Sequence, residues 1–370
     1  MRIDRNFRSA LAVAILVLGV GCATRPGVRA PERRPADVRA ELVRLLPATT
    51  QDREGWAADI TAAFSALEID PGTSNICATL AVVGQESNYT TDPAVPGLGR
   101  IARAEIDRRA EQHDVPQLLV HAALSLKSSD GRSYADRIAG VHTERELSLV
   151  YEDFINRVPM GRRLFADANP VHTGGPMQVS VAFAEEEAHQ RDYPYPVDVS
   201  IRHEVFSRRG GVYFGIAHLL GYPVSYERMI YRFADYNAGF YASRNAAFQN
   251  AVSVATGIAL ALDGDLIGYD SDKPGATELA VRSMSRQIDL DDSAIRRALE
   301  KGESIDFETT DLYRRVFARA QKVSHQQLPR AVLPQIALKS PKIKRKLTTE
   351  WFATRVDQRY RECLAKARSG

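Results

Sequence analysis

The chain has 370 residues, of which 44% are hydrophobic and 26% are charged, as in an ordinary soluble globular protein. This length is enough for one large domain or two smaller ones. The formal net charge is only +3, which argues against the strongly basic surface of a nucleic-acid-binding protein and excludes nucleic acid as the expected partner.

The first 21 residues have the pattern of an export signal, with three arginines before residue 9 and an apolar run over residues 11–20. The run is about half of the ~20 residues that a membrane-spanning helix needs, so cleavage is expected rather than a permanent transmembrane anchor. Residues 18–22 resemble a bacterial lipobox, although Gly19 stands where lipoboxes usually have leucine. The resemblance implies that residues 1–21 are a signal peptide and that Cys22 is acylated. Ala23, in place of a retention aspartate, implies an outer-membrane lipoprotein facing the periplasm.

A folded domain is expected to begin after residues 22–36, which hold the lipidated cysteine and a proline-containing, flexible tether. Apolar residues at helical spacing predict a helix around Trp56 to Leu67, which Pro71-Gly72 ends. The next helix is apolar nearly all round from Ile76 to Val83, as in a buried central helix, and ends near Glu86.

Helical patterns continue through the rest of the chain, and the period-2 pattern of strands is scarce. Thr143 and Glu146 form a capping box before a helix, and residues 205–220, 226–236 and 243–262 repeat the helical spacing. Near the end, Phe352, Val356, Tyr360 and Cys363 share one helical stripe, so Cys363 should face a core. The sequence therefore predicts a mostly α-helical protein.

Three short motifs follow one another along the chain: Gln-Glu-Ser at residues 85–87, Gly-Gly-Pro-Met-Gln at residues 174–178, and Tyr-Asn-Ala-Gly at residues 236–239. Together they resemble the signature of the soluble lytic transglycosylases, over roughly residues 74–248. The chain also resembles a bacterial lipoprotein family, domain of unknown function 1615. The resemblance implies a lysozyme-like helical domain that cleaves the β-1,4 bond between N-acetylmuramic acid and N-acetylglucosamine in peptidoglycan.

Glu86 is the candidate catalytic residue. Glycosidic cleavage needs a carboxylic acid that is still protonated near neutral pH, and an apolar environment raises the pKa of a carboxyl group. Glu86 ends an apolar helix, where the negative end of the helix dipole also disfavours the anion. A surface glutamate at a helix end is the plainer interpretation of the same position.

The resemblance implies that this one glutamate acts first as acid and then as base, that the product carries a 1,6-anhydromuramoyl end, and that no cofactor or metal is needed. It also implies substrate contacts by Ser87, Met177, Gln178, Tyr236 and Asn237. Three of these residues have a structural alternative: Met177 as core filler, Tyr236 as a buried aromatic, and Asn237, with residues 238–239, as a helix stop.

The spacing departs from the family pattern, because Glu86 and Gly174 are separated by a segment where the family has a short connection. We expect a lysozyme-like catalytic domain over residues 37–262 with a helical insertion at about 98–170, and a helical C-terminal extension over residues 263–370 packed on the domain. The insertion either shapes the substrate groove or packs away from it.

Cys77 and Cys363 are the cysteines left beside Cys22. An oxidising periplasm would allow them to pair, and two buried free thiols are the alternative. Cys77 lies nine positions before Glu86, on the opposite face of the helix, so a bridge there would avoid the cleft.

Two other functions remain open at this stage. A hydrolase resembling goose-type lysozyme would need a second carboxylate that faces Glu86 and activates water. A non-catalytic outer-membrane lipoprotein would keep the groove in order to bind peptidoglycan or a protein partner. In each case the membrane is reached through the N-terminal lipid.

Overall fold

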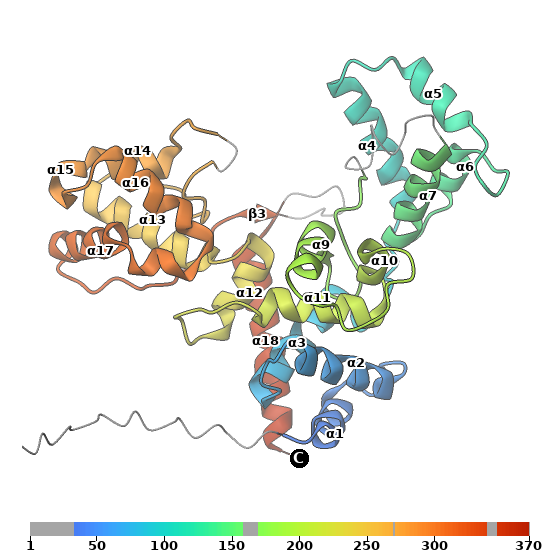
Figure 1. Ribbon diagram of the computed structural model, residues 1–370, viewed down its shortest axis with the longest axis horizontal. Coiled ribbons are helices and arrows are strands. Elements are labelled where there is room, and N and C mark those ends of the chain that lie inside the picture. Colours follow the sequence, from blue (N-terminus) through green and yellow to red (C-terminus); the bar gives the residue numbers. More distant parts are fainter. Residues whose placement is uncertain (1–32, 158–168, 269–270, 339–345, 370) are drawn as a thin grey trace, which may run out of the picture.

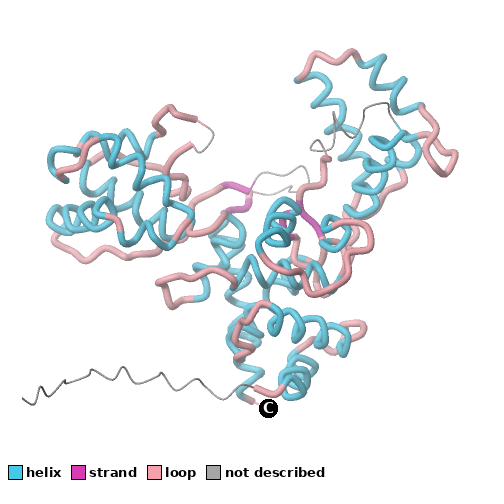
Figure 2. Tube along the Cα trace, viewed as in Figure 1, coloured by secondary structure: helices cyan, strands magenta, loops and turns pink. Residues whose placement is uncertain are grey.

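The computed structural model describes residues 33–157, 169–268, 271–338 and 346–369, and it is mostly helical (Figures 1 and 2). The predicted mostly α-helical class is therefore confirmed. None of the helices in this part of the chain combines the length and the apolar character needed to cross a membrane. The predicted signal peptide and Cys22 lie outside the described residues. The first helix begins at Pro35, inside the last two residues of the predicted tether.

A central core forms the middle of the molecule (Figure 1). It is built from α1 (Pro35–Leu45), α2 (Arg53–Ala66), α3 (Thr73–Glu86), α9 (Val181–Gln190), the short α10 (Ile201–Val205), α11 (Arg208–Leu220), α12 (Met229–Ala238) and α18 (Thr349–Arg368). The helix α3 is buried along most of its length, as its apolar sequence predicts.

Side-chain caps fix where several of these helices begin. The carboxylate of Asp52 accepts a hydrogen bond from the Gly55 amide at the start of α2, at 3.1 Å. Ser207 does the same for the Gly210 amide at the start of α11, at 3.0 Å. Each cap supplies a partner to an amide that the first helical turn leaves without one, so the sequence itself sets these boundaries.

The last helix, α18, lies along α3 and α12 in the centre of the molecule. Its apolar stripe, with Phe352 and Val356 fully or nearly fully buried, joins the central core. A disulfide joins Cys77 to Cys363, and the Ser74 and Tyr360 hydroxyls are hydrogen-bonded at 2.9 Å on the same side of α3. The predicted pairing of the two cysteines is thus confirmed, and it ties the end of the chain to the helix that carries Glu86.

Residues 98–157 form an arm with a core of its own, here called the insertion arm. Its helices are α4 (Leu98–Gln112), α5 (Gln117–Ser125), α6 (Tyr134–Ala139) and α7 (Glu144–Arg157). The predicted capping box opens α7: the Thr143 hydroxyl accepts from the Glu146 amide, and the Glu146 carboxylate accepts from the Thr143 amide, both at 3.2 Å. The arm joins the centre through Phe206 and through an ion pair of Glu152 with His203 at 2.7 Å.

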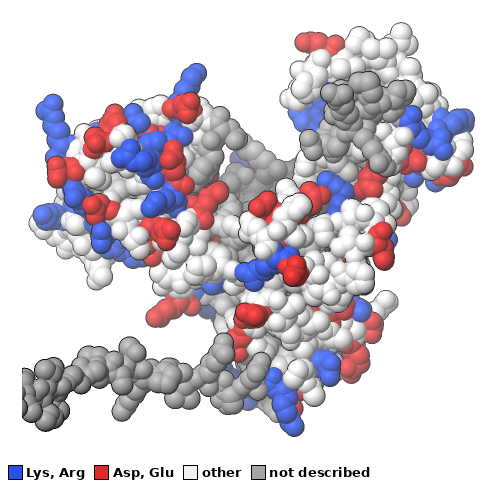
Figure 3. Space-filling model, viewed as in Figure 1, with Lys and Arg blue, Asp and Glu red and all other residues white. Residues whose placement is uncertain are grey.

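A second arm, here called the C-terminal arm, stands on the other side of the centre in Figure 1. It contains α13 (Ala242–Thr256), α14 (Ala276–Ser283), α15 (Ser285–Ile288), α16 (Asp292–Leu299), the 3-10 turns η2 (Glu300–Glu303) and η3 (Ile305–Thr309), and α17 (Asp311–Ser324). Basic and acidic side chains alternate over its surface in Figure 3, as on a face in contact with water. The strands in the described residues form two short antiparallel pairs: β1 (Thr173–Gly174) with β2 (Val179–Ser180), and β3 (Ala337–Leu338) with β4 (Leu347–Thr348).

This division of the chain differs from the expected one at two helices. We placed α13 in the catalytic domain, yet its buried side chains pack with α14 to α17. We placed α18 in a C-terminal extension packed on the domain, and it lies within the central core itself. In both helices the local pattern shows an apolar face, and a face of this kind does not say which distant helix will cover it.

Candidate active site

The fold brings the three motifs together, although they are far apart in the sequence. Glu86 ends α3, the residue 174–178 turn joins β1 to β2, and Tyr236 lies in the last turn of α12. The Tyr236 hydroxyl donates a hydrogen bond of 2.7 Å to the Met177 carbonyl. Burial raises the pKa of Tyr236, and the nearby charge of Glu86 raises it further. Tyr236 therefore contacts the turn and lies beside the candidate acid.

Glu86 has the electrostatic environment of a carboxylic acid that holds its proton. Burial raises the pKa of Glu86 to about 8 from the ordinary 4.5. Within the described residues, no hydrogen bond or ion pair to its carboxyl group offsets this loss of solvation. Part of its surface stays open to solvent, as an acid that must reach a substrate requires. At neutral pH the side chain is consequently a proton donor.

The chain after Glu86 turns sharply and packs back on α3. Asn88 and Tyr89 both have positive φ, and the Tyr89 hydroxyl donates to the Leu80 carbonyl at 3.0 Å. A Cβ on Gly84 would lie 3.2 Å from the Tyr89 hydroxyl, a distance shorter than most real Cβ contacts, so Tyr89 would have to shift by a few tenths of an ångström. The glycine in the last turns of α3 is thus explained by the close approach of Tyr89, which holds the helix end that carries Glu86.

Ser87 is buried, and its hydroxyl donates to the Val83 carbonyl at 3.1 Å. The same carbonyl accepts from the Ser87 backbone amide at 3.0 Å, so both donors of Ser87 bond to the last turn of α3. The side chain therefore positions the helix end. Its predicted contact with substrate stays a prediction.

Met177 and Gln178 hold the turn against α11. Met177 is fully buried, and a Cβ on Gly215 would overlap its sulfur and its side-chain carbons. Gly215 is therefore needed so that α11 can approach the turn. Gln178 has a φ of 51°, and its side-chain amide donates to the Gly175 carbonyl at 3.3 Å. The burial of Met177 favours its role as core filler, so what the turn offers to the site is its backbone and Gln178.

Asn237 is exposed at the end of α12, where its side-chain oxygen accepts from the Thr349 hydroxyl at 2.9 Å. Thr349 is the first residue of α18, so this bond joins the third motif to the terminal helix. The neighbouring Asp235 is buried and accepts from the Ser243 amide at 2.7 Å and from the hydroxyls of Tyr222 and Tyr226. These contacts fix the end of α12 and so the position of Tyr236.

His218 is a residue of this site that sequence reasoning missed. Its ring lies 4.8 Å from the rings of Phe183 and Phe240 and 4.9 Å from that of Tyr236. Burial lowers the pKa of His218 to about 4, so the ring is neutral at physiological pH. Its Nδ1 is buried and has no hydrogen-bond partner among the described residues. The spacing within α11 marks this position only as helical, and no local motif indicates that it faces the site.

In the described ranges, no group of three or more His, Cys, Asp and Glu side chains is arranged so that it could hold a metal ion. The chemistry that the site can offer from its own side chains is therefore proton transfer by Glu86 next to the Tyr236 hydroxyl.

Comparison with known proteins shows the family to which the chain belongs. A family profile described as "Protein of unknown function (DUF1615)" matches residues 49–366. The "Uncharacterized protein YaiW" of Escherichia coli (strain K12) is 54% identical over 360 residues, which are 97% of this chain and 98% of that protein. No solved structure matches. The match runs from before α2 into α18, so it includes the centre and both arms.

Proposed function

Because the chain belongs to the DUF1615 family, whose description assigns no activity, we propose a function from the site: peptidoglycan lytic transglycosylase, with Glu86 as the acid. One observation carries the proposal. A carboxyl group with a pKa of about 8 ends a buried helix, beside the residue 174–178 turn and the tyrosine of the third motif. We further propose that the centre of the molecule is lysozyme-like, with α3 as its catalytic helix.

In the proposed reaction, the protonated Glu86 gives its proton to the oxygen that leaves between N-acetylmuramic acid and N-acetylglucosamine. The resulting carboxylate then accepts the proton of the muramic acid 6-hydroxyl while that oxygen bonds to C1. The second step closes the 1,6-anhydro ring and returns Glu86 to its protonated form. No water is consumed, so one carboxyl group is sufficient.

The electrostatics of Glu86 support this route over hydrolysis by two carboxylates. A second catalytic carboxylate would lie close enough to raise the Glu86 pKa by charge repulsion. Among the residues described, burial alone shifts the pKa of Glu86. The lack of a charge contribution favours a reaction in which one carboxyl group is sufficient.

The residues around Glu86 fit a supporting role in the same reaction. Tyr236 keeps its hydroxyl on the Met177 carbonyl, and its ring lies against the neutral His218, so this wall of the site is uncharged. An uncharged wall keeps Glu86 protonated, because it supplies no cation that would stabilise the carboxylate. We propose that Gln178 and Asn237, the more exposed polar groups here, contact the sugar.

The proposed location follows the same substrate. Peptidoglycan lies in the periplasm, and a lipid on Cys22 would hold the protein at the outer membrane with its site facing that layer. The first helix begins at Pro35, and the segment between Cys22 and this helix would serve as the tether.

The test is to incubate the purified protein with peptidoglycan sacculi and to identify soluble products by mass spectrometry. We expect muropeptides with 1,6-anhydromuramoyl ends. Products with reducing ends would replace the proposal by a hydrolase. Binding to sacculi without any soluble product would replace it by a non-catalytic peptidoglycan-binding lipoprotein.

A further inference from the structure

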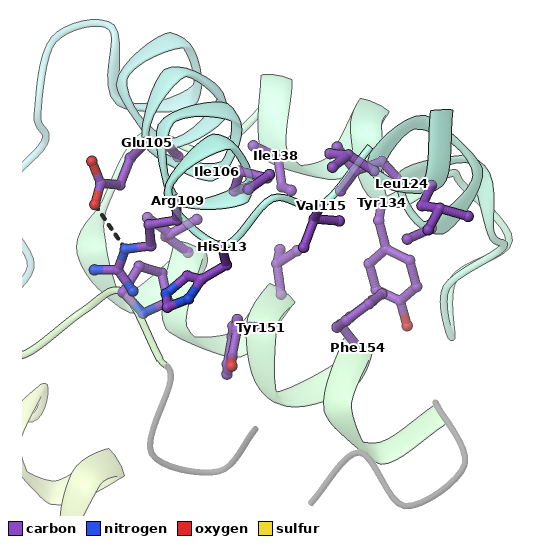
Figure 4. Close-up of a pocket in the computed structure, with 18 residues that line it drawn as sticks. Glu105, Ile106, Arg109, His113, Val115, Leu124, Tyr134, Ile138, Tyr151 and Phe154 are labelled. Atoms are coloured by element: carbon purple, nitrogen blue, oxygen red, sulfur yellow. Dashed lines mark hydrogen bonds and ion pairs between the residues drawn. The ribbon is translucent and has the colours of Figure 1, made fainter. Parts of the chain in front are cut away.

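The insertion arm encloses a pocket of about 740 Å³ (Figure 4). Helices α4, α5, α6 and α7 form its walls, with Pro170 at one side. Most of the lining is aliphatic or aromatic, and includes Ile106, Val120, Leu124, Ile138, Val150 and Phe154. The pocket belongs to the separate core of the arm and shares no lining residue with the site of Glu86.

The pocket opens to the surface, so it is a cleft between the helices and not a sealed interior cavity. Its volume lies within the roughly 300–1,000 Å³ range of pockets that take organic ligands. The helices of the arm thus line a space that an apolar molecule can enter.

The two ends of the pocket differ in polarity. Figure 4 shows Glu105, Arg109 and His113 at one end, and Leu124, Tyr134 and Phe154 at the other. Glu105 accepts hydrogen bonds from both Arg108, at 2.6 Å, and Arg109, at 2.7 Å. Of the two arginines only Arg109 lines the pocket, and it bonds Glu105 through its Nε, so no hydrogen bond among the described residues occupies its two terminal nitrogens. The bonds from both arginines also hold the pKa of Glu105 at about 2, so its negative charge persists at any physiological pH.

An apolar path joins the pocket to the outside. Val115 and Leu119 line the pocket and also expose 40% and 58% of their surface. Leu118, which precedes Leu119 on α5, is 79% exposed. Val115 and Leu119 therefore continue the apolar lining of the pocket to the surface of the arm.

We propose that this pocket binds a long-chain fatty acid, with its hydrocarbon chain between α4, α5 and α7 and its carboxylate at Arg109. A single hydrocarbon chain suits a mostly apolar space with one polar end. A carboxylate can accept hydrogen bonds from both terminal nitrogens of Arg109, in the bidentate geometry that a guanidinium group favours. The exposed leucines of α5 give the chain a route into the pocket.

The experiment titrates the purified protein with cis-parinaric acid, a fatty acid whose fluorescence rises in apolar surroundings. We expect saturable binding of one molecule per chain, which palmitic acid displaces. Hexadecylamine has a chain of the same length with a cationic head, and we expect it to displace the probe at least tenfold less well, because its charge opposes that of Arg109.

Two variants locate the binding. Ala123→Trp fills the pocket from a partly exposed position of α5, and we expect it to abolish binding; Ala122→Trp, on the exposed side of the same helix, should bind normally. Arg109→Gln should weaken palmitic acid about tenfold or more, as the loss of a charge-assisted hydrogen bond does, whereas Arg103→Gln on the same helix should not.

Four results would overturn the proposal. They are no saturable binding of the probe, wild-type binding by Ala123→Trp, equal displacement by hexadecylamine and palmitic acid, and displacement by farnesyl phosphate at lower concentrations than palmitic acid. The last result would assign the pocket to a phosphorylated isoprenoid. None of these measurements depends on peptidoglycan cleavage, so the pocket and the proposed function can fail separately.

Discussion

Glu86→Gln should lower the rate of product release from sacculi by about 10²-fold or more, because glutamine cannot transfer a proton to the leaving oxygen. Glutamine has the shape of the protonated acid, so the fold and the binding of sacculi should be preserved. The measurement is the initial rate of muropeptide release, with Glu68→Gln as the matched control, since Glu68 is exposed at the end of α2. A variant that keeps more than half of the wild-type rate would exclude Glu86 as the acid.

The raised pKa of Glu86 makes the activity and the stability of the wild type depend on pH, and Glu86→Gln should remove this dependence. The acid is active while it is protonated, so the wild-type rate should fall as pH rises through about 8. Stability changes with the same sign: the native state binds more protons than the unfolded chain between pH 4.5 and 8, so stability falls as pH rises across that window. The cost approaches about 4 to 5 kcal/mol above pH 9, from ~1.4 kcal/mol for each pKa unit. Urea unfolding at pH 4 and pH 9 should show this fall in the wild type and its absence in Glu86→Gln.

Removing the Cys77–Cys363 disulfide should lower the free energy of unfolding by about 2 to 5 kcal/mol. The bond closes a loop with a sequence separation of 286 residues, and a loop of that length restricts the unfolded chain strongly. It also holds α18 against α3, so its loss should loosen the helix that carries Glu86. The measurement is urea unfolding of the double variant Cys77→Ala, Cys363→Ala.

The matched control for the disulfide is Cys22→Ala, which removes the cysteine outside the bond and should leave the unfolding midpoint unchanged. Adding reductant to the wild type should reproduce the effect of the double variant. Equal unfolding midpoints for oxidised wild type and double variant would show that packing of α18, and not the bond, holds the C-terminal helix in place.

Local chemistry could be predicted from the sequence wherever neighbouring residues determine it. The end of α3 near Glu86, the capping box of Thr143 and Glu146, and the helical stripe of α18 all follow from residues within a few turns of one another. The disulfide was predictable for another reason: once Cys22 is assigned to the lipobox, two cysteines have one possible pairing.

Features that depend on long-range packing could not be predicted in this way. The turn of residues 174–178 reaches Tyr236 only because Gly215 lets α11 approach Met177. The neutral His218 becomes part of the site through three aromatic rings from other elements. The pocket of the insertion arm lies between its four helices. The amphipathic pattern of a helix is the same whether its apolar face packs on a neighbouring helix or lines a pocket, so the sequence does not indicate the pocket.

The substrate contacts predicted for Ser87 and Met177 show how a motif and a structure can differ in what they indicate. The motif implies contacts with substrate for both residues, and these contacts stay predictions. The structure shows a packing role for each: the Ser87 hydroxyl bonds to the last turn of α3, and Met177 is buried against α11. Asn237 remains exposed, and we expect it to contact the sugar.

The central claim is that the fold keeps Glu86 protonated at neutral pH, and the most direct measurement is the pKa of that carboxyl group. The protein can be labelled with ¹³C at the glutamate side-chain carboxyl carbon, and the Glu86 resonance can be identified by its loss in Glu86→Gln. The structure predicts that this resonance titrates near pH 8. Titration near the ordinary value of 4.5 would show an ionised, solvated side chain and would contradict the proposed catalysis.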